Sequence, residues 1–142
     1  MSSPAFENGG SVPDEYTCDE ADVSPALTFG EVPENAKSLA LIMDDPDAPM
    51  GTWVHWVIWN IPPNTTGLSK GENIIFPQGT NDFGKQEYEG PCPPSGTHRY
   101  FFKLYALDTM LDLGAGATKN QLEEAMSGHI IAQGQLMGTY SR

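Results

Sequence analysis

The sequence predicts a mainly β protein, an antiparallel β-sandwich with one short helix in its C-terminal half. Two observations predict this fold class, and the chain length predicts the number of domains. The chain has 15 glycines and 12 prolines among 142 residues, a load that favours many turns between short strands over long helices. Segments 52–61 and 99–107 are rich in β-branched and aromatic residues, which are typical of strands. The length fits a single domain covering residues 1–142.

The first half of the chain contains two apolar strand candidates. Residues 38–43 form a compact apolar run that is typical of a buried strand, and we expect it to end at Asp44. Residues 52–61 are mostly apolar on both faces, which predicts a central strand covered on both sides. The following segment, 64–97, is rich in Gly, Asn, Pro and Ser, and a loop of this length is usually functional or hides short elements.

The second half predicts two more strands and the helix. Along 99–107, the even-numbered side chains form an apolar face and the odd-numbered ones a mixed face, and a last strand is expected over 130–140. Between them, Thr118 is a good N-cap, Gln121 completes a capping-box pattern, and Gly128 suits a helix C-terminus. These signals predict a helix from Thr118 to Gly128.

The charge balance excludes several kinds of partner. Seven basic and 19 acidic residues give a net charge of −12, which opposes binding to nucleic acid and to anionic membranes. No apolar run approaches the length of a membrane span, and the first ten residues lack the features of a signal peptide. We therefore expect a cytoplasmic protein with no nucleic-acid partner and no stable membrane association.

The two cysteines, Cys18 and Cys92, fit no zinc motif. The sequence leaves a bridge between them open. For a cytosolic protein, two reduced thiols in a packed interior are the favoured interpretation.

Polar residues flank the strong strands and suggest a site. Asp45 and Asp47 follow the strand over 38–43, His55 lies within the strand over 52–61, and His98 precedes the strand over 99–107. Rigid loops at strand ends are where binding groups concentrate, so we expect these side chains to lie close together.

The residue types in this set point to binding of a small anion. A carboxylate beside an imidazole fixes the ring and favours its protonated form, and two histidines then offer N–H donors to a phosphate or carboxylate. Tyr100 adds a hydroxyl donor, Trp53 could form an apolar wall, and the stiff turn Gly90–Thr97 could offer backbone amides.

Simpler structural interpretations compete at several positions. His55 alone would most often be a core histidine, and Asp44 before a proline-rich segment is expected to form a turn. His129 follows the helix, where a positive charge suits the helix dipole, so we interpret it as structural. Trp56 and Trp59 are expected in the core.

An enzyme is the alternative function. Cys92, His98 and a carboxylate could form a Cys-His-Asp hydrolase. However, prolines flank Cys92 and no helix N-terminus lies behind it to lower its thiol pKa, so we expect no catalytic residues. A metal site of two His and two Asp lacks the close ligand spacing of zinc motifs, and we expect no metal or cofactor.

Three segments together resemble the phosphatidylethanolamine-binding protein family, also called the Raf kinase inhibitor-like family. They are Asp-Pro-Asp-Ala-Pro at 45–49, Trp-Val-His-Trp at 53–56 and Gly-Pro-Cys-Pro-Pro-Ser-Gly-Thr-His-Arg-Tyr at 90–100. The similarity spans essentially the whole chain and is greatest to the bacterial and archaeal branch. It implies a β-sandwich with a small pocket for phosphate-like anions, a homodimer, and regulation of a partner protein such as a kinase.

The resemblance also assigns residues. Asp45 and Asp47 match the two aspartates of the first motif, His55 the pocket histidine, and Pro94 the proline that lines the pocket. His98 and Tyr100 match the histidine and tyrosine of the last motif, whereas Arg99 is expected to face away and to pair structurally. The animal branch has a second histidine where this chain has Val54. The complete set of candidate ligand-binding residues is Asp45, Asp47, Trp53, His55, Gly90, Pro94, His98 and Tyr100.

Overall fold

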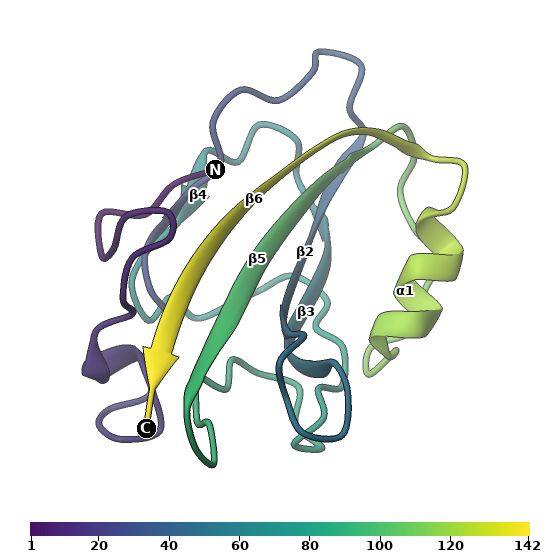
Figure 1. Cartoon of the computed structure of the whole chain (residues 1–142). Helices are drawn as coiled ribbons and strands as arrows, with labels where there is room; N and C mark the ends of the chain where they lie inside the picture. The colour runs from purple at the N-terminus through teal and green to yellow at the C-terminus, as the bar shows by residue number, and fades with distance from the viewer.

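The computed structural model describes residues 1–142 and shows a mainly β protein (Figure 1). Six strands, one α-helix and one 3₁₀ turn make up its regular structure. In chain order they are η1 (Asp14–Tyr16), β1 (Leu27–Thr28), β2 (Ser38–Asp45), β3 (Trp53–Ile61), β4 (Gly67–Leu68), β5 (Thr97–Leu107), α1 (Lys119–Met126) and β6 (Ile130–Ser141).

The main sheet has four antiparallel strands in the order β3-β2-β5-β6, and β1 pairs with β4 in a second, two-stranded sheet. All eight residues of β2 are buried, so β2 is the fully enclosed central strand. The expectation that segment 52–61 is central is wrong, because β3 lies at the edge of the main sheet. Its apolar residues are nevertheless covered, since segment 77–89 runs along its outer edge and hydrogen-bonds to it.

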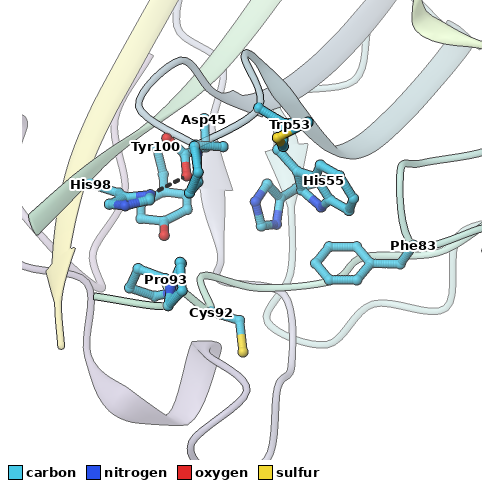
Figure 2. Close-up of a pocket in the computed structure, with 12 residues that line it drawn as sticks. Asp45, Trp53, His55, Phe83, Cys92, Pro93, His98 and Tyr100 are labelled. Atoms are coloured by element: carbon cyan, nitrogen blue, oxygen red, sulfur yellow. Dashed lines mark hydrogen bonds and ion pairs between the residues drawn. The ribbon is translucent and has the colours of Figure 1, made fainter. Parts of the chain in front are cut away.

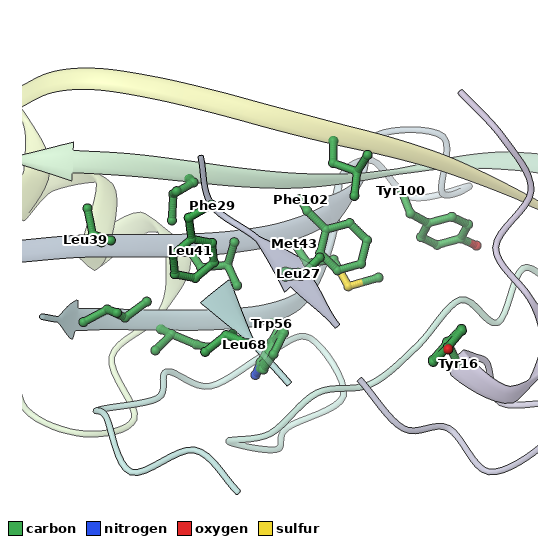
Figure 3. Close-up of a cluster of buried hydrophobic side chains, with 14 of the residues drawn as sticks. Tyr16, Leu27, Phe29, Leu39, Leu41, Met43, Trp56, Leu68, Tyr100 and Phe102 are labelled. Atoms are coloured by element: carbon green, nitrogen blue, oxygen red, sulfur yellow. The ribbon is translucent and has the colours of Figure 1, made fainter. Parts of the chain in front are cut away.

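Two apolar layers pack on opposite faces of the main sheet. The small sheet and the N-terminal segment cover one face, and Figure 3 shows Leu27, Phe29 and Leu68 packed against side chains of the main sheet there. Helix α1 covers the other face with Leu122 and Met126. The predicted antiparallel β-sandwich is therefore confirmed, and Trp56 and Trp59 are buried on opposite faces as core residues.

The capping signals of the helix are confirmed. The Thr118 hydroxyl accepts a hydrogen bond from the Gln121 amide, and the Gln121 side chain accepts one from the Thr118 amide. The helix ends at Met126, two residues before the expected end. Gly128 then adopts a left-handed backbone conformation with φ of 81°, which glycine accommodates at low cost.

The main departure from the expected elements is at the end of β2. The strand continues to Asp45, and Asp44 pairs with Phe101 of β5 instead of forming a turn. Likewise β5 begins at Thr97, two residues earlier than expected. These extensions place Asp45 and His98 on adjacent strands. No helix in the structure is both long and apolar enough to cross a membrane.

A disulfide joins Cys18 to Cys92, across 74 residues of chain. The favoured interpretation of two reduced thiols is therefore wrong. It depended on an assumed cytosolic setting, whereas the fold brings the two Cα atoms to 5.5 Å, within the usual range for a disulfide.

Candidate functional site

A cavity of about 240 Å³ opens at the end of the main sheet where β2 ends and β5 begins (Figure 2). Six of the eight predicted site residues line it: Asp45, Trp53, His55, Pro94, His98 and Tyr100. Three adjacent strands supply five of them, and the loop before β5 supplies Pro94. The structure thus brings together polar groups that are up to 55 residues apart in the sequence.

Asp45 and His98 form a buried pair at one side of the cavity. Oδ2 of Asp45 lies 2.6 Å from Nδ1 of His98, and both residues are almost fully buried. The other carboxylate oxygen, Oδ1, accepts a 2.7 Å hydrogen bond from the backbone amide of Asp47, which fixes the carboxylate. Because Nδ1 of His98 is engaged by Asp45, Nε2 is the ring nitrogen left to meet a ligand.

His55 lies across the cavity from this pair. Its Nδ1 is 2.6 Å from the backbone oxygen of Glu89, and because a carbonyl can only accept, this nitrogen carries a proton. Burial lowers the pKa of His55, so the ring is biased toward its neutral form. In that form Nε2 is an acceptor, and it favours a ligand atom that carries a proton.

Tyr100 lies between the two histidines. Its ring stacks on His98 at 6.4 Å and meets His55 edge-on at 5.3 Å, measured between ring centroids. The hydroxyl is buried, and no group of the chain accepts a hydrogen bond from it, although the backbone of Cys92 lies close to its oxygen. Burial raises the pKa of Tyr100, so the hydroxyl keeps its proton. An unpaired buried hydroxyl is costly, and a ligand acceptor would remove that cost.

Apolar side chains form the rest of the wall. Trp53 meets Phe83 edge-on at 5.6 Å, and Phe83 also contacts His55 at 5.3 Å. Six further residues line the cavity and were not among the predicted ligand-binding residues: Ala48, Pro49, Met50, Phe83, Cys92 and Pro93. Phe83 lies in the irregular segment 64–97, where no periodicity marks it, but Pro93 is next to the predicted Pro94 and could have been included.

Two predicted site residues do not line the cavity. Asp47 forms a two-pronged ion pair with Arg99, with oxygen–nitrogen distances of 2.8 and 2.9 Å. The Arg99 guanidinium lowers the pKa of Asp47 to about 2. The structural role of Arg99 is thus confirmed, and Asp47 is its partner and not a lining group.

Gly90 has a packing role beneath the cavity wall. A Cβ atom there would overlap the backbone oxygen of Tyr16, so only glycine fits. Its amide donates a 2.8 Å hydrogen bond to Asp22, and the Gly96 amide donates to the backbone oxygen of Arg142. Two of the amides expected to form an anion-binding concavity are therefore already engaged.

The disulfide ties this wall to the N-terminal part of the chain. Cys92 lines the cavity, and its sulfur is bonded to that of Cys18. In this form the Cys-His-Asp hydrolase hypothesis has no thiol to supply the nucleophile. The next residue, Pro93, is held through its backbone oxygen by Arg142 at 3.2 Å.

Asp44 and His129 lie away from the cavity. Asp44 is buried on the opposite face of the sheet, where its Oδ2 is 3.1 Å from Lys103 Nζ and 2.8 Å from Lys119 Nζ. His129 pairs with Asp108 at 2.7 Å, consistent with a structural role. No group of three or more His, Cys, Asp or Glu side chains is arranged to hold a metal ion.

An antiparallel β-sandwich with one small His- and Tyr-lined cavity at a strand end defines the class of protein. Comparison with known proteins makes this specific: residues 2–141 match the family described as phosphatidylethanolamine-binding protein. The chain belongs to this family, as its motifs suggested.

Relatives and solved structures are similar to this chain over its full length. A UPF0098 protein of Methanothermobacter thermautotrophicus is 53% identical over 150 residues, covering 100% of this chain and 98% of the relative. The crystal structure of CT736 from Chlamydia trachomatis, described as a putative phosphatidylethanolamine-binding protein homologue, superposes with a TM-score of 0.96. It is 46% identical and covers 99% of this chain and 95% of its own.

YbcL of Escherichia coli is a more distant solved structure, described as a new member of the mammalian family. It is 30% identical, with a TM-score of 0.91 and coverage of 99% of this chain and 96% of its own. The similarity is therefore one of whole chains and not of an isolated motif.

Proposed function

We propose that the cavity binds a small phosphate-like or carboxylate anion. The observation that carries this proposal is the Tyr100 hydroxyl, a protonated donor with no acceptor in the chain, on the cavity wall between the two histidines. Donors fixed by the surrounding fold need no reorganisation when a ligand arrives, so they bind an anion with little entropic cost. The stacked ring of His98, held by Asp45, supplies a second fixed polar group.

The cavity also favours a particular charge on its ligand. No lysine or arginine lines it, Asp45 is one of its walls, and the chain carries a net charge of −12. A doubly charged anion would find no fixed cation here to offset its desolvation. A singly charged anion with one acidic proton suits the site better, because that proton can be donated to Nε2 of neutral His55 while other oxygens accept from Tyr100.

NMR of the imidazole groups tests this proposal. Addition of inorganic phosphate or phosphoethanolamine at millimolar concentration should shift the Nε2 signals of His55 and His98. His129, which lies outside the cavity, serves as the internal control. The Tyr100→Phe variant removes only the hydroxyl and should weaken binding about tenfold, the loss of one hydrogen bond to a charged group. Unchanged His55 and His98 signals at saturating phosphate would refute anion binding.

Regulation of a partner protein such as a kinase is a second proposal. It is favoured by exposed apolar side chains at the cavity mouth, where Met50 is 93% and Phe83 40% exposed. Solvent-exposed apolar residues beside a ligand pocket allow a bound ligand to change the surface offered to a partner. Capture from native lysate on immobilised protein, with and without phosphate, tests this. A partner retained equally by wild type and Met50→Lys would contradict the proposal.

A further inference from the structure

The disulfide between Cys18 and Cys92 lies where solvent can reach it. Both cysteines are exposed, and they are the only two in the chain. Thiol exchange needs access for an attacking thiolate, and exposed disulfides are the labile ones, whereas disulfides that only stabilise a fold resist reduction. The position of this bond therefore permits exchange with a thiol while the protein is folded.

An arginine contacts both sulfurs of the bond. Nη2 of Arg142 lies 3.5 Å from Sγ of Cys18, and Nη1 lies 3.7 Å from Sγ of Cys92. The same guanidinium pairs with Asp19 and donates to the backbone oxygen of Pro93, and these two contacts hold it in place. A positive charge beside a cysteine favours the thiolate, which is the form that leaves when a disulfide is cleaved. Arg142 is thus placed to stabilise the leaving sulfur.

The two segments that the disulfide joins are also held by other contacts. The Cys18 amide donates to the backbone oxygen of Pro91 at 3.2 Å, and the Tyr88 hydroxyl donates to that of Tyr16 at 2.7 Å. Neither contact depends on the covalent bond, so the segments stay side by side after reduction. The two thiols then remain near enough for the bond to form again, and the chain can pass between both states without unfolding.

Cys92 connects the disulfide to the anion cavity. It lines the cavity together with Pro93 and Pro94, and its backbone lies close to the hydroxyl oxygen of Tyr100. Figure 2 shows this hydroxyl directed toward the segment that carries Cys92 and Pro93. Prolines stiffen the segment, and the disulfide fixes it to the N-terminal part of the chain. Loss of the bond therefore increases the freedom of the wall beside the Tyr100 donor.

We propose that the Cys18–Cys92 bond is a redox-active site, which a dithiol reduces in the folded protein, and that reduction weakens anion binding in the cavity. The second part rests on the proposed function. Unbonded sulfurs cannot lie as close together as bonded ones, so Cys92 and the wall that carries it must shift. Donors that are no longer held in place bind an anion at a higher entropic cost, so the oxidised chain is the binding form.

The exchange takes place in two steps. One thiolate of the dithiol attacks a sulfur of the disulfide, the S–S bond breaks, and its electron pair passes to the other cysteine, which leaves as a thiolate beside Arg142. The second thiolate of the dithiol then attacks the mixed disulfide and releases the first cysteine. The dithiol is oxidised to a cyclic disulfide, the two cysteines are reduced, and the protons that the dithiol gives up pass to the cysteines through solvent.

The rate of reduction by dithiothreitol tests the first part. Wild type should be reduced without urea and with an unchanged circular dichroism spectrum. Arg142→Gln should slow the reaction about fivefold, because the leaving thiolate loses its nearby charge, whereas Arg142→Lys should keep most of the wild-type rate. Arg99→Gln is the matched control: it removes the same charge from an exposed ion pair with Asp47 and should leave the rate unchanged.

Two outcomes of this experiment would contradict the first part. A bond that dithiothreitol opens only after urea has unfolded the chain is not redox-active in the folded protein. Equal rates in wild type and Arg142→Gln would show that Arg142 does not assist cleavage.

NMR of the oxidised and reduced chain tests the coupling to the cavity. Without ligand, reduction should shift the ring signals of Tyr100 and His98, whereas those of His129, outside the cavity, should not move. Reduced protein should bind inorganic phosphate about tenfold more weakly than oxidised protein, and reoxidation should restore the affinity. The double variant Cys18→Ser, Cys92→Ser should behave like the reduced form.

The signals without ligand keep this test separate from the proposed function. If phosphate binds neither form, anion binding is refuted, and the shifts of Tyr100 and His98 still decide whether the bond controls the cavity. Unmoved signals of both rings on reduction would overturn the coupling. Equal phosphate affinity of the oxidised and reduced forms would overturn it as well.

Discussion

Asp44 and Asp45 are neighbours on β2, and strand alternation places them on opposite faces of the same sheet. Both are buried, with exposures of 1% and 3%. Asp44 forms ion pairs with Lys103 and Lys119, and these two positive charges offset its negative charge. Asp45 faces one histidine beside an open cavity. The residue type therefore does not define the site. The group that faces the carboxylate determines whether the carboxylate stabilises the fold or orients a ligand-binding side chain.

The largest expected change in stability comes from the disulfide that cross-links the cavity face of the sheet. Replacing Cys18 and Cys92 by serine should lower the free energy of unfolding by about 4 kcal/mol, the value expected for a loop of this length. The helix face has no such cross-link. Urea unfolding of wild type with and without a dithiol reductant should show the same difference. Equal stability of the variant and the oxidised protein would contradict this role.

Asp44→Asn should be the next most damaging change. It leaves Lys103 and Lys119 facing a buried site without a carboxylate, at a cost of about 3 kcal/mol in the free energy of unfolding. Phosphate affinity should stay at the wild-type value, since Asp44 lies on the other face. A loss of phosphate binding in a folded Asp44→Asn protein would break the separation between the two faces.

Asp45→Asn should have the opposite effects, a larger loss of phosphate affinity and a smaller loss of stability than Asp44→Asn. It removes the charge that orients His98, so phosphate affinity should decrease about tenfold while stability decreases by only about 1 kcal/mol, the net value of one hydrogen bond. Titration calorimetry and urea unfolding of the two asparagine variants, side by side, measure both quantities. Similar profiles for the two variants would show that the two aspartates have the same role.

The pH dependence of stability tests the burial of His55. Its pKa is lowered in the folded state, chiefly by burial, so the unfolded state binds protons first as the pH falls below about 6.5. Its contribution to stability is present above that pH and is lost as the pH falls toward the folded-state pKa. Unfolding at pH 7.5 and 5.5 should show a smaller decrease in His55→Gln than in wild type. An equal decrease in the free energy of unfolding of both proteins would contradict the lowered pKa of His55.

The smallest effect is expected at Asp47, outside the cavity. Asp47→Asn removes a partly exposed ion pair and should change stability by less than about 1 kcal/mol. Because the pKa of Asp47 is lowered to about 2, its contribution should be present at pH 5 and be lost between about pH 4 and 2. Phosphate binding should not change. A clear loss of phosphate binding in Asp47→Asn would show that Asp47 contributes to the ligand site.

The sequence predicted the fold class and most of the cavity because their signals are local or lie in continuous motifs. The capping pair Thr118 and Gln121 specifies the start of the helix within four residues. The segment around His98 and Tyr100 carries its strand and its polar groups together, so the alternation of side chains could be used directly.

The rest depends on contacts between distant segments. The edge position of β3 could not be read from its apolar residues, because segment 77–89 covers it in place of another strand. Phe83 enters the cavity from an irregular loop, and the Cys18–Cys92 bond depends on an approach across 74 residues. Asp47 was assigned by its motif, but its neighbour Arg99 in the folded chain engages both of its oxygens.

A crystal soaked in phosphate would show directly whether the cavity on the Asp45 face binds an anion. We expect a tetrahedral anion within hydrogen-bond distance of the Tyr100 hydroxyl and of Nε2 of His55 and His98, with Asp45 still paired to Nδ1 of His98. The same soak of Tyr100→Phe should show lower occupancy. A cavity that holds only water at saturating phosphate, with His98 and Tyr100 oriented as they are now, would contradict it.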